Sequence, residues 1–333
     1  MNPLAVSVII PTYNRKASLG ATLRSLAGQS LPAECFEVIL ADDGSTDGTP
    51  ELAAGAWPFP LRYLRQANQG DAAARNLGAS HSQADLLVFL DDDMVAGPDY
   101  LAALAAEHEG HQKRIVIGLE RLWLAPSDPL AAADALPAPA AGPPSQPVPF
   151  AQVCSNNMSM QRQAYCALGM MQGLDFSGSS MWCDVDFAYR AYQQGFEFRR
   201  SARAICWHRD YTAVSLASRK RRLREVARRA PALFMRHPGL VHHLPMFDDK
   251  TPIAWGQDPA RLIGRKLARH AASSRPALWG LEQIARWLEG RAPASKSHRR
   301  LDRWIVGGHM WRGYRQGLRE AAGAIKAGVR TDD

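Results

Sequence analysis

The chain has 333 residues, of which 46% are hydrophobic and 22% are charged, and its formal net charge is +8. This composition is ordinary for a globular protein and excludes a disordered or fibrous chain. No run of about 18 uncharged apolar residues occurs, so no membrane-spanning helix is predicted. The first residues lack a basic segment ahead of an apolar one, so we expect no secretory signal and a cytoplasmic protein. The five widely spaced cysteines form no C-x-x-C pair, which indicates free thiols rather than a structural zinc site.

Short apolar runs alternate with helical patterns over the first 110 residues. The predicted strands are 6–11, 36–41, 61–65 and 85–90, and the predicted helices are 15–28, 71–80 and 100–108. Strands that alternate with helices indicate right-handed βαβ units. Such units form a mostly parallel sheet with helices on both faces. The predicted fold class is therefore α/β, with a Rossmann-like sheet.

The three most polar segments of this half each follow a predicted strand. They are 11–14, 42–44 and 91–93. In open parallel sheets, ligands bind beyond the carboxyl ends of the strands. We therefore expect these segments to share one rim of the sheet, with a binding site between them.

The composition changes twice in the rest of the chain. Residues 125–149 are rich in alanine and proline, which predicts a mobile loop. A second folded stretch at 150–210 contains a predicted helix at 184–194, which ends at a glycine. Residues 211–333 are predicted to be mainly helical. We therefore expect an α/β domain over 1–210, with its nucleotide-binding half in 1–110, followed by a helical extension.

The polar segments suit a nucleoside diphosphate. Tyr13 offers an aromatic face for a base, and Asp42 or Asp43 offers an acceptor for a ring N–H. Because carboxylates repel a diphosphate, a divalent cation must lie between them, held by oxygen ligands such as Asp91 and Asp93. The cation would neutralise the charge that develops on the leaving diphosphate.

Four segments in this order, VSVIIPTYNR, ADDGSTDGT, NQGDAAARNLG and FLDDDM, resemble those of family 2 glycosyltransferases. The resemblance extends to SNNMSMQRQAYCALG and WCDVDFAYRAYQQG in the second half. It implies the GT-A fold, a UDP-, GDP- or dTDP-sugar as donor, Mg²⁺ or Mn²⁺, and usually inversion at the anomeric carbon. On the family's pattern, Asp43 would read the base, Tyr13 would stack on it and Asp93 would ligate the metal.

Further residues of the same motifs are expected to contact the donor. Arg75 could make a forked contact with phosphate or fix an aspartate. The full expected donor-binding set is Pro11, Tyr13, Arg15, Asp42, Asp43, Asn68, Arg75, Asp91 and Asp92. The expected metal ligands are Asp91, Asp93 and His208. For His208, a histidine satisfied by the fold is an open alternative.

The family's late motif is Glu-Asp followed by x-Asp-x-x-x-Arg, and its Asp is the usual general base. Asp184, Asp186 and Arg190 match this motif, but Cys183 stands in the place of the Glu. Direct displacement needs a base on the acceptor hydroxyl, so Asp184 is the predicted catalytic residue. Two structural alternatives stay open. Asp184 could merely cap its helix, and Asp186 with Arg190 could be a helix ion pair.

Three other functions compete with glycosyl transfer. A nucleotidyltransferase would normally carry a Gly-rich phosphate loop after the first strand, where this chain has PTYNR. A nucleic-acid-binding protein could use the basic cluster 219–229, but zinc spacing and an aromatic RNA-binding motif are lacking, so no nucleic-acid partner is expected. An inactive nucleotide-sugar-binding module stays open because of Cys183.

The acceptor is expected to be a glycan or a lipid-linked sugar in cell-surface polysaccharide or glycolipid biosynthesis. Basic residues crowd the predicted helix 218–229, and four later tryptophans lie among arginines, which is the composition of an interfacial surface. These tryptophans are Trp279, Trp287, Trp304 and Trp311. The sequence thus predicts a salt-sensitive, peripheral contact with the inner face of the cytoplasmic membrane. The alternative is that the tryptophans pack a helical core and the arginines face water.

Overall fold

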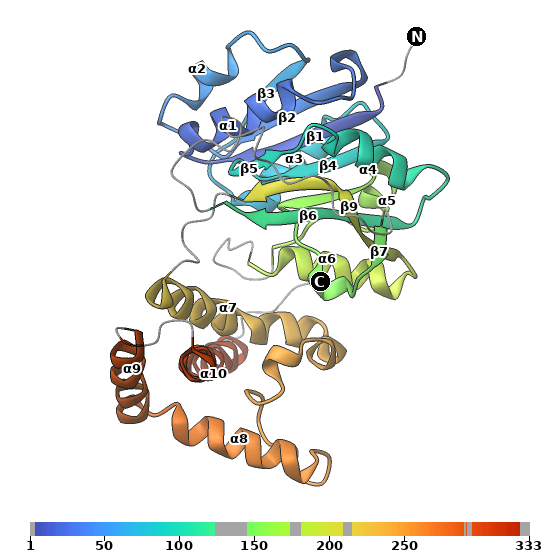
Figure 1. The fold of residues 1–333 in the computed structure, drawn as a ribbon. Coiled ribbons are helices and arrows are strands. Elements are labelled where there is room, and N and C mark those ends of the chain that lie inside the picture. The colour runs from blue at the N-terminus through green and yellow to red at the C-terminus, as the bar shows by residue number, and fades with distance from the viewer. Residues whose placement is uncertain are drawn as a thin grey trace. The chain divides into compact units, whose positions relative to one another are not determined.

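The structure is a computed structural model that describes residues 4–123, 145–173, 181–208, 215–289, 291 and 295–326. The chain divides into two compact units, Met1–Asp210 and Tyr211–Asp333, and each is described by itself (Figure 1). The first unit combines strands with helices, and the second is helical. An α/β fold followed by a helical region, as predicted from the sequence, is thereby confirmed.

One mixed sheet forms the centre of the first unit. Its nine strands, counted over the described residues, follow the order β3-β2-β1-β4-β8-β6-β9-β5, and β7 pairs with β9. The strands are β1 (Val6–Thr12), β2 (Phe36–Asp42), β3 (Leu61–Arg65), β4 (Leu86–Leu90), β5 (Met94–Ala96), β6 (Arg114–Leu122), β7 (Ser145–Pro147), β8 (Asn157–Gln161) and β9 (Glu197–His208). Strands β1 to β4 are parallel, as are β6 and β9. The antiparallel strands are β8, between β4 and β6, and β5 and β7, which pair with β9.

Helices pack on both faces of this sheet. They are α1 (Lys16–Ala27), α2 (Thr49–Ala53), α3 (Asp71–Ser80), α4 (Tyr100–His108), α5 (Arg162–Ala167) and α6 (Cys183–Gln193). On one face, Leu19 and Leu23 of α1 share a buried core with Leu101 of α4 and alternate residues of the strands. On the other face, α3 lies so close to β1 that a Cβ at Gly78 would meet Ile9 Cγ2 at 2.5 Å.

The elements of the first hundred residues occur where the sequence predicts them. β3, α3 and α4 begin and end at the predicted residues, β1, β2 and β4 differ by one residue at one end, and α1 differs by one residue at each end. Every residue of β1 and β2 is buried. Their sequences are therefore continuous apolar runs rather than alternating ones, because a parallel strand covered on both faces exposes neither.

The sequence prediction is less complete after residue 110. Strand β8 reads NMSMQ and its polar residues are buried; Ser159 contacts the His108 ring at 2.8 Å. Residues 124–144 of the predicted mobile loop lie outside the described residues. The end of that predicted loop is not a loop, because Ser145–Pro147 forms β7 against β9.

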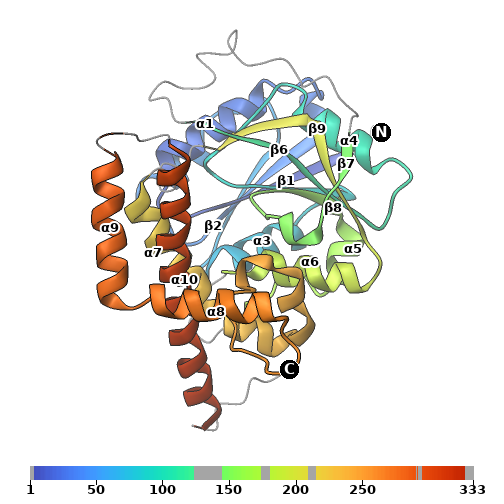
Figure 2. The same ribbon diagram turned by 60° about the horizontal axis from the view of Figure 1, so that its bottom comes forward.

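The second unit is a group of helices around a long pair. They are α7 (Leu216–Arg236), α8 (Ala260–Ala272), α9 (Arg275–Glu289) and α10 (Lys296–Lys326). α7 and α10 lie side by side (Figures 1 and 2). A Cβ at Gly313 or Gly317 would overlap the carbonyl oxygen of Arg224 or Arg228, so these glycines permit the close approach. Among the described helices, none combines the length and hydropathy needed to cross a bilayer.

Candidate active site

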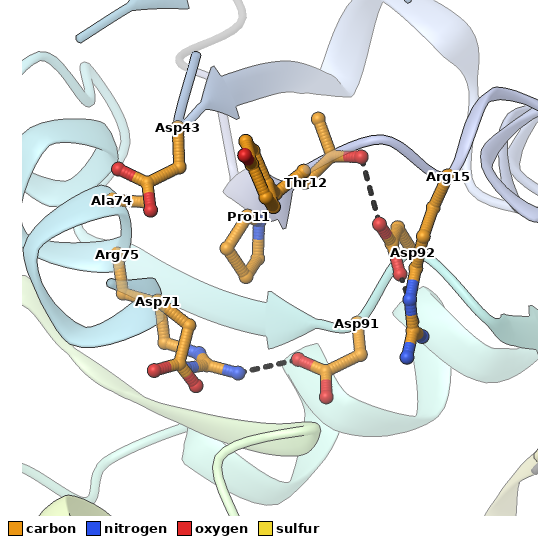
Figure 3. Close-up of a pocket in the computed structure, with 10 residues that line it drawn as sticks. Pro11, Thr12, Arg15, Asp43, Asp71, Ala74, Arg75, Asp91 and Asp92 are labelled. Atoms are coloured by element: carbon orange, nitrogen blue, oxygen red, sulfur yellow. Dashed lines mark hydrogen bonds and ion pairs between the residues drawn. The ribbon is translucent and has the colours of Figure 1, made fainter. Parts of the chain in front are cut away.

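A cleft of about 280 Å³ opens at the carboxyl ends of β1, β2 and β4 (Figure 3). It is lined by Pro11, Thr12, Tyr13, Arg15, Asp43, Asp71, Ala74, Arg75, Asp91 and Asp92. The three polar segments singled out in the sequence therefore meet at one rim. Four of the lining residues are aspartates and two are arginines, so the cleft is acidic.

Tyr13 is half-exposed at the mouth of the cleft, with 48% of its surface accessible. The turn that carries it is held by the next residue. Asn14 has a positive φ of 54°, and its side-chain oxygen accepts a hydrogen bond from the Thr46 N–H at 2.7 Å. Its own N–H donates to Ser45 Oγ at 2.9 Å. The ends of β1 and β2 are thereby joined, which fixes the place of Tyr13 relative to Asp43.

The two aspartates after β2 have different surroundings. Asp43 lines the cleft and accepts from Gln66 Nε2 and from the Gln69 and Gly70 N–H groups, at 2.7 to 2.8 Å. A carboxylate has about four acceptor positions, so roughly one remains for a ligand. Asp42 is fully buried and accepts from the Ser45 N–H and the Tyr63 hydroxyl.

Two residues of the expected donor set lie outside the cleft. Asp42 is not among the lining residues, and its bonds to Ser45 and Tyr63 give it a structural role under the β2 turn. Asn68 is exposed and also absent from the lining. Neither residue lines the cleft, and their part in donor binding stays a prediction. Asp42 differs from Asp43 because its carboxylate is enclosed by Ser45 and Tyr63.

Arg75 joins two of the aspartates from beneath. Its side chain is 2% exposed, and it donates to Asp71 Oδ2 at 2.6 Å and Asp91 Oδ1 at 2.5 Å. Figure 3 shows Arg75 reaching between these two carboxylates. Burial and the neighbouring Asp93 raise the pKa of Asp91, although Arg75 opposes the shift. Of the two roles considered for Arg75, fixing an aspartate is the one that the structure displays.

Asp92 faces the opposite wall of the cleft. It accepts from the Thr12 hydroxyl at 2.7 Å, and Arg15 Nη1 lies 3.3 Å from its second oxygen. Burial raises the pKa of Asp92 to about 7. Arg15 also contacts Asp93 Oδ2 at 2.5 Å, so one half-exposed arginine balances both carboxylates.

Asp93 and His208 lie together beside the cleft rather than among its lining residues. His208 Nε2 is 3.4 Å from Asp93 Oδ1, and Nδ1 is 2.8 Å from Glu120 Oε1. Burial opposes the charged ring, but the two carboxylates raise the pKa of His208 to about 10. The neighbouring His208 and Arg15 lower the pKa of Asp93 against the opposing effect of burial.

The site offers oxygen atoms that a divalent cation could use. Asp93 Oδ1 is buried, and its contact with His208 Nε2 is long, at 3.4 Å. Asp91 uses Oδ1 for Arg75. Over the same part of the chain, no group of three or more His, Cys, Asp or Glu side chains is already gathered as a metal site. Asp91 and Asp93 thus fit a cation such as Mg²⁺ or Mn²⁺ that is bound partly by water and by its diphosphate ligand.

Asp184 lies in the first turn of α6, close to the same cluster. Its Oδ1 accepts from the Val185 N–H at 2.8 Å, and its carboxylate is hydrogen-bonded to the thiol of Cys154. Burial raises the pKa of Asp184, while the nearby charge of Arg75 opposes the shift. The bond to Val185 is not a helix cap, because the N-cap of α6 is Trp182 and no side-chain hydrogen bond caps that end. This bond uses one oxygen of Asp184, so it does not exclude a further role.

The other residues of the late motif have structural partners. Asp186 is completely buried, and its Oδ2 accepts from Arg190 Nε at 2.9 Å. The Arg190 guanidinium also donates to the carbonyl oxygens of Leu168 and Met170. The pair therefore ties α6 to the segment that follows α5. Cys183 is buried, and burial raises the pKa of its thiol, so it stays neutral where the family has a Glu.

A second cavity of about 310 Å³ adjoins this region. It is lined by Ile117, Gly118, Leu119, Glu120, Gln152, Cys154, Asn156, Asn157 and Arg200. The Asp91 N–H donates to the Asn156 carbonyl at 3.0 Å, which connects the wall of this cavity to the first cleft. Cys154 connects it to Asp184, and Glu120 connects it to His208.

Three residues of this site have no role in the sequence prediction. Asp71 stands four residues before Arg75, a spacing that allows a helix ion pair. This contact could therefore have been predicted from the sequence. Glu120 and Cys154 come from a strand and a turn that the sequence does not mark as polar motifs. Their contacts with His208 and Asp184 join segments that are far apart in the chain. Such contacts cannot be predicted from a local sequence pattern.

We expect Arg75→Met to destabilise the protein by about 3 kcal/mol, near the low end for a broken buried ion pair. The low end is chosen because the Asp71 and Asp91 side chains are partly exposed, at 46% and 29%. Urea unfolding with circular dichroism measures the loss. The control is Arg162→Met, whose partner Asp85 is 94% exposed at 3.6 Å, and which should cost no more than about 1 kcal/mol. Equal losses of stability in the two variants would show that the ion pairs of Arg75 stabilise the protein no more than a surface ion pair does.

Residues 7–121 match the family described as "Glycosyl transferase family 2", which confirms the resemblance for that part of the chain. A Validoxylamine A glucosyltransferase of Streptomyces hygroscopicus subsp. jinggangensis is 43% identical over 117 residues, which are 34% of this chain and 28% of the relative. An uncharacterized glycosyltransferase of Bacillus subtilis, YfnE, is 42% identical over 118 residues, 35% of this chain and 30% of the relative. The chain therefore matches less than a third of the length of these relatives.

Solved structures resemble the chain over nearly all of its length. A mannosyltransferase from Pyrobaculum calidifontis in complex with GDP-Man and Mn²⁺ superposes with a TM-score of 0.61 at 19% identity, covering 96% of this chain and 88% of that one. Residues 1–349 of S. aureus TarS in complex with UDP give a TM-score of 0.50 at 18% identity, covering 96% and 92%. At these identities the likeness concerns the fold, and it confirms the expected GT-A type.

Proposed function

We propose that this chain, whose residues 7–121 carry the family 2 glycosyltransferase signature, transfers a sugar from a nucleoside-diphosphate donor to an acceptor hydroxyl in a metal-dependent reaction. The observation that carries the proposal is the acidic cleft at the ends of β1, β2 and β4. It holds an exposed aromatic ring and a carboxylate with a free acceptor position at one end, and Asp91 and Asp92, with Asp93 beside them, at the other.

The base of the donor binds at the Tyr13 end. Tyr13 stacks on the ring, as its exposed face at the mouth of the cleft allows. Asp43 accepts the ring N–H with the position that its three existing hydrogen bonds leave open. Pro11 forms the apolar wall between them. Discrimination among UDP-, GDP- and dTDP-sugars rests on these few contacts.

The diphosphate binds at the Asp91–Asp93 end. Asp91 and Asp93 hold the cation, which when bound neutralises negative charge on the leaving diphosphate. His208 positions Asp93 through their contact; as a metal ligand it would first have to lose the proton that Asp93 and Glu120 stabilise on its ring. Arg15 exchanges part of its ion pairing with Asp92 and Asp93 for a phosphate oxygen, since half of its side chain is exposed. Arg75 keeps Asp91 in place from beneath.

Asp184 acts as the general base in an inverting displacement. It accepts the proton of the acceptor hydroxyl while that oxygen attacks the anomeric carbon. Loss of water around Asp184 raises the pKa of its carboxyl, which makes it a stronger base than an exposed aspartate. The thiol of Cys154 and the Val185 N–H orient the carboxylate.

The acceptor enters through the second cavity. That cavity touches Asp184 through Cys154 and the metal-binding region through Glu120. Its amide, carboxylate and guanidinium groups suit an acceptor rich in hydroxyl groups, such as a glycan or the sugar of a lipid-linked glycan. We propose a role in cell-surface polysaccharide or glycolipid synthesis at the cytoplasmic side of the membrane.

Two other functions use the same cleft. An inactive nucleotide-sugar-binding module would bind the donor and leave it intact, and the neutral Cys183 in place of the family's Glu is the feature that favours it. A nucleotidyltransferase would form a new bond at a phosphorus atom. Incubation of the donor with Mn²⁺ separates the three, because a glycosyltransferase slowly hydrolyses its donor to the nucleoside diphosphate and free sugar. An intact donor would favour the inactive module.

Thermal unfolding with a panel of UDP, GDP, dTDP and ADP, with and without Mn²⁺, tests the proposal directly. We expect one nucleotide at 100 times its Kd to stabilise the protein by about 2.7 kcal/mol. The effect should need Mn²⁺ or Mg²⁺ and disappear with EDTA. A panel without any metal-dependent stabilisation would refute the proposed donor site, whatever the acceptor is.

A further inference from the structure

The basic helix predicted to meet a membrane is α7. Several of its basic residues form ion pairs inside the second unit. Arg219 pairs with Asp302 at 2.8 Å, and Lys220 pairs with Glu282 at 2.8 Å. The other pairs are Arg228 with Glu225 and Glu320, and Arg229 with Glu225. Three of these pairs join α7 to α9 or α10 and two lie along α7 itself, so these side chains help to hold the second unit together.

Helix α9 presents a different surface. Its three large exposed side chains are Trp279, Ile284 and Trp287, with 67%, 52% and 56% of their areas accessible. At 100° per residue these positions fall within one arc of the helix. The opposite side of α9 is buried through Leu278 and Ala285, toward α10, which lies beside it (Figure 2). The exposed apolar arc, here called the α9 face, is therefore separate from the face that packs.

The charges around the α9 face have one sign. Arg275 and Arg286 are exposed and lie along one edge of it. The Arg291 guanidinium lies over the Trp287 ring, 4.4 Å from its centroid. The nearest acidic residue, Glu282, is turned inward to Lys220 and His309. The other, Glu289, falls on the far side of the helix from Trp287. The α9 face is thus apolar at its centre and positive at its edge.

The side chains of the α9 face also support one another. With its amide oriented to satisfy its hydrogen bonds, Gln283 accepts from Trp279 Nε1 at 3.2 Å and from Arg286 Nη2 at 2.6 Å. A tryptophan and an arginine are thereby held in place on the same surface. Because these two side chains are already ordered, docking would cost less side-chain conformational entropy.

We propose that the α9 face docks on an anionic lipid surface, with Trp279 and Trp287 entering the headgroup region and the arginines pairing with lipid phosphates. Tryptophan is suited to this region because its ring is apolar and its N–H is polar. Apolar residues with a rim of basic ones are the pattern of helices that lie in the plane of a membrane interface. The occupant is a lipid surface rather than a protein, because a positive rim without carboxylates matches a uniform field of anionic headgroups.

Co-sedimentation with vesicles tests the proposal without knowledge of the donor or the acceptor. The full chain is mixed with one of two kinds of phosphatidylcholine vesicle. One kind contains about 30% phosphatidylglycerol, an anionic lipid, and the other contains none. We expect binding to the anionic vesicles at low salt, a loss of at least about tenfold at high salt, and a blue shift of tryptophan emission on binding. Equal binding to both vesicle types, or no binding at low salt, would overturn the proposal.

The variant Trp279→Ser/Trp287→Ser should lose at least about tenfold in partition to anionic vesicles. The matched control is Trp255→Ser, which removes a tryptophan that is 74% exposed but lies outside α9. An equal loss in the control would place the contact elsewhere. Circular dichroism checks that each variant is folded.

Sedimentation velocity of the wild type and the double variant checks for a second copy of the chain. A change of oligomeric state on substitution would make the α9 face a protein interface instead. Donor binding is measured in parallel, and its failure alone would leave this proposal standing.

Discussion

Asp184→Asn should bind the donor nearly as well as the wild type and lose transfer by about two to four orders of magnitude, which is the range for a general base. An asparagine has the same shape, and its side-chain oxygen can still accept from the Val185 N–H. The substitution therefore keeps this hydrogen bond and removes only the ability to take a proton. Single-turnover transfer, alongside calorimetry of donor binding, measures the two quantities separately.

The pH dependence of transfer gives this prediction a second readout. A base acts in its ionised form, and burial raises the pKa of Asp184. Activity should therefore be lost as the pH falls through a value above that of an ordinary aspartate. The acidic limb of the profile should be absent from the residual activity of Asp184→Asn. Folding stability should not fall, because a carboxyl whose pKa is raised by folding is a cost to the folded state at neutral pH.

The control for Asp184→Asn is Asp85→Asn, which removes the same charge from a side chain that is 94% exposed. Transfer by the control should match the wild type. If Asp184→Asn transfers within tenfold of the wild type, the residue has only a structural role in the first turn of α6. Another group, from the second cavity or from the Asp91–Asp93 cluster, would then have to serve as the base.

The accuracy of the sequence prediction follows from how local each signal is. β1 and β2 are continuous apolar runs and α3 has a clear helical pattern, so their places in the chain are predicted within a residue. β8 could not be found in this way. Its buried Ser159 and Asn157 are satisfied by His108, Tyr100 and Gly118, and these partners become neighbours only after folding.

The same distinction holds for the site. The Tyr13 and Asp43 positions follow from the rule that ligands bind at strand ends. The difference between Asp42 and Asp43 depends on their partners, because Ser45 and Tyr63 enclose Asp42 while Asp43 lines the cleft. The contacts from Glu120 through His208 to Asp93 join β6, β9 and the turn before β5. In the second unit, the arginines of α7 look like a free basic patch in the sequence, but their partners come from α9 and α10.

The substitution with the largest expected effect on donor binding is Asp93→Asn. Its Oδ1 is buried and has His208 Nε2 at 3.4 Å as its neighbour rather than a close hydrogen bond, so a cation that displaces this contact could bind there. An amide oxygen carries no net charge and binds a hard divalent cation more weakly than a carboxylate. We expect the Mn²⁺-dependent part of nucleoside diphosphate binding to fall by more than about 100-fold, because loss of even an outer partner of a metal site costs about 10- to 100-fold.

Calorimetry with UDP, or with whichever nucleotide the thermal panel selects, is run with Mn²⁺ and with EDTA. The matched control is Asp92→Asn, in the same turn, whose carboxylate is engaged by Thr12 and Arg15 and whose pKa is raised to about 7 by burial. That variant should keep the metal dependence, since its oxygens already have partners. The opposite pattern, with metal dependence lost in Asp92→Asn and kept in Asp93→Asn, would move the cation to the other wall of the cleft. It would also leave Asp93 as the counter-charge that holds Arg15 and His208, because its contacts with those two residues do not depend on a metal.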